Sequence, residues 1–121
     1  MIDPSPECQL RFEGDNGVDL AVTHIEARFP NGRKKIVRIV LGHPFRSRRY
    51  EAFAVRAELD GLETTGCPIV GEDALQALLL ALRFLASRLS DFHEKGICRF
   101  YWPDSEVEFA IHNYFDLLSL S

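Results

Sequence analysis

The longest apolar pattern in the chain runs from Ile69 to Leu89 and predicts an amphipathic helix. Its apolar residues recur every three or four positions, the spacing that places side chains on one helical face. The core-facing stripe consists of Leu75, Leu78, Leu79, Leu82, Leu85, Leu89 and Phe92. Asp73 followed by Gln76 matches a capping box, and Gly96 after Lys95 is typical of a helix end.

A second apolar stripe is expected on the other side of the same helix. Leu80 and Phe84 are four residues apart and lie roughly opposite the core stripe, with the small residues Ala77 and Ala81 beside them. Burying Leu80 and Phe84 would contribute roughly 3–6 kcal/mol, so we expect another surface to cover them. Three occupants stay open: the C-terminal segment of the chain, a second copy in a homodimer, or a different protein.

Alternating apolar and polar residues before the helix predict strands at 18–29, 34–42 and 50–59, with a short fourth strand just before the helix. Asn31–Gly32 is the strongest hairpin signal. After the helix, two apolar segments flank "PDS" as a second hairpin, and "HNYFDLLSL" is expected to contain a helical turn. This order predicts an α+β fold, in which one long helix packs across an antiparallel sheet of about four to six strands.

The 121 residues fit one domain, and the apolar fraction of 46% is ordinary for a globular protein. Residues 1–17 combine prolines, glycines and acids and predict a loosely ordered acidic arm, which leaves 18–121 as a single α+β domain. No run of apolar residues is long enough for a membrane span, and the acidic N-terminus lacks the apolar region of a secretory signal.

The three cysteines, Cys8, Cys67 and Cys98, are scattered along the chain. Such a set is typical of reduced thiols, although a disulfide between two of them stays open. We therefore expect a cytoplasmic protein that does not associate with membranes.

Charge is unevenly distributed along the chain. The formal net charge is −4, but the segment from Ala27 to Tyr50 contains no acid and carries +8, which leaves −12 for the rest. The candidate basic patch consists of Lys34, Lys35, Arg46, Arg48 and Arg49. Such a patch is typical of nucleic-acid contacts, whereas the sequence pI of about 5.5 disfavours them. The basic residues could instead pair with acids of residues 3–26 or face an acidic protein.

The residue types that build metal and catalytic sites are dispersed. The four histidines are His24, His43, His93 and His112. They lie far apart without an HxH, HExxH or CxxC motif, so no metal site is expected. No sequence feature activates the thiols, and no glycine-rich phosphate loop is present. We therefore expect no enzymatic activity and no cofactor.

The segment "PIVGEDALQALLLALRFL" (68–85) resembles a family of small, uncharacterised bacterial domains with the pattern G-x-D-x-L-Q-A-L-x-L-A-L. The matching positions are Gly71, Asp73, Leu75, Gln76, Ala77, Leu78, Leu80, Ala81 and Leu82. The segment "LGHPFRSRRYEAFAVRAELDGL" (41–62) is similar to the same family's loop, extended run and glycine turn. The resemblance implies a compact α+β fold and no established activity. Domains of this size are also common among immunity proteins of bacterial toxins, which is a link by analogy.

The late hairpin supplies the candidate partner-binding residues. These are Tyr101, Trp102, Asp104, Glu106 and Glu108. Aromatic residues are enriched in interface hot spots, and carboxylates steer a basic partner; the alternatives are that Trp102 caps the core edge and that the carboxylates are only solvated. The sequence therefore predicts a non-enzymatic protein-binding domain, with an immunity protein that neutralises a bacterial toxin as its specific form. The alternative is a nucleic-acid-binding or regulatory module that uses the basic segment 28–49.

Overall fold

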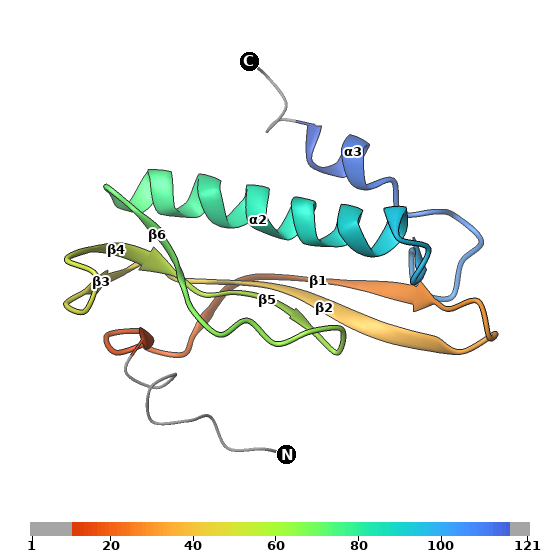
Figure 1. Cartoon of the computed structure of the whole chain (residues 1–121), viewed down its shortest axis with the longest axis horizontal. Helices are drawn as coiled ribbons and strands as arrows, with labels where there is room; N and C mark the ends of the chain where they lie inside the picture. Colours follow the sequence, from red (N-terminus) through yellow and green to blue (C-terminus); the bar gives the residue numbers. More distant parts are fainter. Residues whose placement is uncertain (1–10, 117–121) are drawn as a thin grey trace.

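The computed structural model describes residues 11–116 and shows an α+β fold with two antiparallel sheets (Figure 1). The larger sheet has the order β5 (Ala57–Asp60), β2 (Lys34–Gly42), β1 (Asp19–Arg28), β7 (Arg99–Tyr101). The smaller sheet has the order β3 (Phe45–Ser47), β4 (Ala52–Val55), β6 (Ile69–Gly71). One long helix, α2 (Ala74–Glu94), packs across the strands, which confirms the predicted fold class.

The hairpin of β1 and β2 is the longest ladder in the structure, and its turn confirms the Asn31–Gly32 prediction. Gly32 has a φ of +88°, which glycine adopts without steric cost, and the Arg33 N–H donates a 2.9 Å hydrogen bond to Asn31 Oδ1. Alternate side chains point toward α2, and Ile25 and Val37 among them are completely buried. The core therefore lies between this sheet and α2.

The strand predicted over 50–59 is divided into β4 and β5, which belong to different sheets. Arg56 lies between them, and its carbonyl accepts a 2.8 Å hydrogen bond from the Gly42 N–H. Its guanidinium binds Asp15 at 3.1 Å and Asp19 at 2.6 Å. The prediction of one continuous strand is wrong because these carboxylates hold Arg56 at the point where the chain passes from one sheet to the other.

Helix α2 begins where the sequence predicts. The Gln76 N–H donates to Asp73 Oδ1 at 2.8 Å, and the Gln76 side chain accepts from the Glu72 N–H at 2.6 Å. Its buried residues are Ala77, Ala81, Leu85 and Leu89. Leu75 and Leu79, predicted to face the core, are exposed by 68% and 45%. The helix is therefore rotated relative to the prediction.

The rotation moves the two alanines of the predicted second stripe into the core, while the contact predicted for Leu80 and Phe84 stays a prediction. Ala77 and Ala81 are fully buried, while Leu80 and Phe84 are half-buried and Phe84 packs against the core. The physical reason is the close approach of the helix to β6. A Cβ on Gly71 would lie only 2.5 Å from the Ala77 nitrogen, so small residues at both positions let the two backbones meet.

The C-terminal part of the described chain confirms the late hairpin and the helical turn. β7 continues into a turn and a returning segment, with Tyr101 bridged to Glu108. The short helix α3 (Ile111–Tyr114) follows and packs beside the C-terminal half of α2 (Figure 1). Residues 117–121, which belong to the segment predicted to cover α2, lie outside the described residues.

The described part of the predicted arm, residues 11–17, contacts the sheets. Asp15 is largely buried against Arg56, and the Arg11 guanidinium donates to the Gly66 carbonyl at 3.2 Å. Residues 1–10 lie outside the described range. None of the helices within residues 11–116 has the length and apolarity that crossing a bilayer requires.

Candidate interaction surfaces

The turn after β7 gathers the predicted partner-binding residues. The Trp102 N–H donates to the Val107 carbonyl at 2.9 Å, and the Val107 N–H donates to Ser105 Oγ at 2.8 Å. Asp104 lies in this turn with a φ of +54°. The structure therefore brings Tyr101, Trp102, Asp104, Glu106 and Glu108 together in one hairpin.

Trp102 is half-buried and anchors this turn to the core. Its ring meets Phe109 edge-on at 5.1 Å and Tyr114 at 6.0 Å between centroids. The Tyr114 hydroxyl in turn lies 3.2 Å from Thr23 Oγ1 on β1. The aromatic cluster therefore fixes the position of the turn relative to the sheet.

The most exposed apolar side chain of this turn is Val107, at 62%. The flanking Glu106 and Glu108 side chains are exposed by 90% and 52%. Sequence reasoning missed Val107 because the EVEF alternation only indicates a strand with Val107 on one face. Within residues 11–116, the short returning segment has no strand on the outer side of this residue.

Arg28 ties the turn to the larger sheet. Its Nε binds Glu26 at 2.7 Å, its Nη1 binds Glu106 at 3.2 Å, and its Nη2 donates to the Ser105 carbonyl. The guanidinium also lies 3.9 Å from the Tyr101 ring centroid. The hydrogen bond with Glu26, followed by that with Glu106, raises the pKa of Arg28 above its usual value. Arg28 therefore stays charged and partly neutralises the acidic surface.

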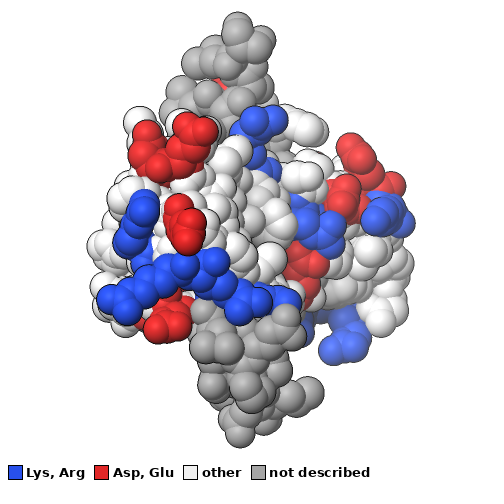
Figure 2. Space-filling model, turned by 60° about the vertical axis from the view of Figure 1, so that its left-hand side comes forward, with Lys and Arg blue, Asp and Glu red and all other residues white. Residues whose placement is uncertain are grey.

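The predicted basic patch is divided between two ends of the molecule. Lys34 and Lys35 begin β2, whereas Arg46, Arg48 and Arg49 follow its other end, about 25 Å away by the rise of a strand. None of these five residues forms an ion pair within residues 11–116. Figure 2, which brings the β3–β4 end forward, shows basic side chains in a band with acidic side chains on both sides. One continuous track for nucleic acid is therefore not formed.

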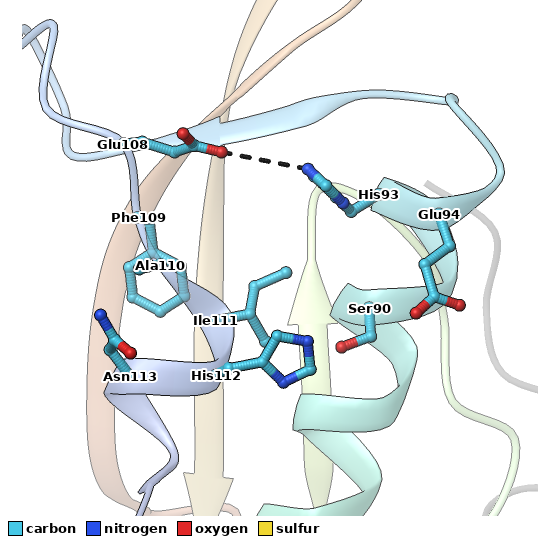
Figure 3. A pocket seen from close by; sticks show the side chains of 9 residues that line it. All are labelled: Ser90, His93, Glu94, Glu108, Phe109, Ala110, Ile111, His112 and Asn113. Atoms are coloured by element: carbon cyan, nitrogen blue, oxygen red, sulfur yellow. Dashed lines mark ion pairs between the residues drawn. The ribbon is translucent and has the colours of Figure 1, made fainter.

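A hollow of about 310 Å³ lies between the C-terminal end of α2 and the segment 108–113. Figure 3 shows His93 directed toward Glu108, with Nε2 3.9 Å from Oε1. Ser90 and His112 also line the hollow, but no hydrogen bond joins them in the described part of the chain. Within that part, no group of three or more His, Cys, Asp or Glu residues could hold a metal ion. Among the described residues, the side chains that line the hollow include no hydrogen-bonded pair of nucleophile and base.

The cysteines are placed separately. Cys67 is exposed, whereas Cys98 is buried at the base of β7, and burial raises the pKa of its thiol. Cys8 lies outside the described residues. A raised pKa keeps the Cys98 thiol protonated, which makes it a poor nucleophile.

No protein-family model, curated protein or solved structure matches the chain. The family resemblance carried by the helix motif therefore stays a prediction.

Proposed function

We propose that the protein is a non-enzymatic protein-binding domain that presents the 102–108 turn to a basic partner. The observation that supports this proposal is Val107, an exposed apolar side chain flanked by the carboxylates of Glu106 and Glu108 on an anchored turn. An apolar contact inside a charged rim is the usual composition of a small interface.

The anchoring of the turn bears directly on affinity. Trp102 packs against Phe109 and Tyr114, and Arg28 binds Glu106 and the Ser105 carbonyl. A turn that is already ordered loses little conformational entropy when a partner binds. The carboxylates of Asp104, Glu106 and Glu108 would accelerate encounter with a basic surface.

Neutralisation of a bacterial toxin, by covering a basic active site, is the specific activity included in this proposal. Its support is the acidic character of the turn and the net charge of −4. The division of the basic patch between the two ends of β2 gives a nucleic-acid-binding module no comparable support.

The test is capture of a partner on the immobilised protein from a lysate of the source cell, followed by titration of the purified partner. We expect Val107→Ser to weaken binding about tenfold, which corresponds to about 1.4 kcal/mol. Ile36→Ser is the matched control, because Ile36 is an apolar side chain exposed by 47% on the larger sheet.

Glu106→Lys tests the electrostatic part of the proposal. We expect slower association at low salt and little effect at high salt, because salt screens exposed charges. Glu72→Lys, at the N-terminal end of α2, is the control for a charge reversal far from the turn. A captured partner that binds Val107→Ser and Glu106→Lys as tightly and as fast as the unchanged protein would refute the proposed surface.

A further inference from the structure

Among the described residues, most of β1 has a neighbouring strand on one side only. β2 pairs with β1 along its whole length, but β7 pairs only with Glu26, Ala27 and Arg28. The segment from Asp19 to Ile25 is therefore an open edge within the described residues. Val18, Leu20 and Val22 on or next to this edge are exposed by 51%, 44% and 37%.

The register shows which backbone groups the open edge presents. The Phe29 N–H donates to the Arg33 carbonyl, and hydrogen-bonded pairs alternate along an antiparallel ladder. Ala27, Ile25 and Thr23 therefore direct their backbone groups toward β2. Val22 and His24 direct their N–H and C=O groups away from β2, where no strand receives them in the described part of the chain.

The other two edges of the strand order are protected. β5 is bridged to Glu63 through Leu59, and β7 is bridged to Glu108 through Tyr101. The 18–25 edge contains neither lysine nor proline, the residues that commonly block pairing at an edge. Its one carboxylate, that of Asp19, binds Arg56 and Arg38. An apolar edge of this kind pairs with another strand unless something covers it.

The helix layer above the edge is also apolar and open. A shallow groove runs over Ala21 and Thr23 and is lined on its other side by Leu82, Tyr114 and Phe115. Leu79 and Leu75 lie one and two turns before Leu82 on the same side of α2, and both are exposed. The unpaired strand and the unpartnered side of the helix therefore border the same side of the molecule.

We propose that a second copy of this chain covers this side, with the two β1 edges paired antiparallel about a two-fold axis at Val22. This register directs the outward N–H and C=O groups of Val22 to the Val22 of the second copy. Because the axis is perpendicular to the sheet, both α2 helices lie on the same layer, and their Leu79 sides face each other.

Side-chain and charge chemistry favour self-pairing about this axis. Val22 meets its own copy on the outer face, and the small residues Ala21 and Thr23 meet on the inner face, below the groove. Asp19 lies away from the axis and is neutralised within its own chain, so the pairing opposes no free like charges. A standard interface buries about 800 Å² per subunit, roughly a tenth of the 7793 Å² accessible surface.

The test is the mass of the full chain in solution over a range of concentrations, measured by light scattering and sedimentation. We expect a dimer for the unchanged protein. Val22→Pro should weaken dimerisation at least tenfold, because it removes the outward N–H while leaving every hydrogen bond between β1 and β2. Val22→Thr retains that N–H and the β-branched shape and should dimerise normally. Leu79→Lys tests the helix layer independently and should also weaken the dimer.

Amide hydrogen exchange distinguishes the occupants of the edge. The amides of Val22 and His24 should be protected in the unchanged protein and exchange rapidly in Val22→Thr only after dilution to monomer. A monomer at every concentration overturns the proposal, as does a dimer unaffected by both Val22→Pro and Leu79→Lys. A monomer whose Val22 and His24 amides lose protection when residues 117–121 are deleted would show that the chain's own C-terminal segment is the occupant. The binding test of Val107 uses a different surface, so either proposal can fail alone.

Discussion

Gly71→Ala tests why α2 is rotated so that its alanines face the strands. The added Cβ would lie 2.5 Å from the Ala77 nitrogen, 2.8 Å from its Cα and 3.0 Å from the Gln76 carbonyl carbon. All three are backbone atoms, so no side-chain rotation relieves the contact. The N-terminal part of α2 must move by about 1 Å, which loosens the packing of the buried Ala77 and Ala81.

Overpacking of this kind costs about 2–3 kcal/mol. For a chain of this size, 1 kcal/mol changes the melting temperature by about 4 °C, so we expect a decrease of about 8–12 °C in a calorimetric or circular-dichroism melt. Gly66→Ala is the matched control, because the nearest atom to its added Cβ is Arg11 Nη1 at 3.9 Å. A Gly71→Ala protein that melts within about 2 °C of the unchanged protein, or no lower than Gly66→Ala, would refute the proposed cause of the rotation.

Two further predictions follow from buried polar groups. Arg56→Met should lower the free energy of unfolding by about 2 kcal/mol or more, because it removes the ion pair of the buried Asp15 carboxylate. The control Arg38→Met removes an exposed ion pair with Asp60 and should lower the free energy of unfolding by less than about 1 kcal/mol. Equal losses for the two variants in a urea titration would show that the burial of Arg56 is unimportant. In a Cys8→Ser background at pH 8, the exposed Cys67 should react with a thiol reagent within minutes. Cys98 should react only on unfolding, because it is buried and burial raises the pKa of its thiol. Equal reaction rates for the two thiols would contradict this assignment.

The features that local sequence determines were predictable. The Asp73–Gln76 capping box and the Asn31–Gly32 turn both form the hydrogen bonds that their residue types favour. The division of the 50–59 strand was not predictable, because Arg56 is held by Asp15, which lies 41 residues earlier in the sequence. A contact of that separation leaves no signal in a local pattern of apolar and polar residues.

Of the two candidate surfaces, the late hairpin was predictable from the sequence and the arrangement of the basic residues was not. The late hairpin brings Tyr101 and the three carboxylates together, as its turn residues predict. The basic residues, which are close in the sequence, lie at opposite ends of β2, because an extended strand of nine residues separates its two ends by about 25 Å. Residues that are close in the sequence come together in space when a turn joins them, and they are kept apart when an extended strand lies between them.

The rotation of α2 shows that an apolar pattern does not always determine which side of a helix faces the core. A helix with apolar residues on several sides offers more than one stripe that could face the core, and transfer energies favour the stripe richest in leucine. In this protein the side that faces the core is instead determined by how closely the α2 backbone approaches β6. Gly71, Ala77 and Ala81 let the helix backbone lie close against β6, and Leu85 and Leu89 fill the wider space further along. The leucines displaced by this choice, Leu75 and Leu79, are then left exposed on the side of α2 from which Leu82 lines the groove over β1, so the packing that completes the monomer also creates the apolar surface proposed to join two copies.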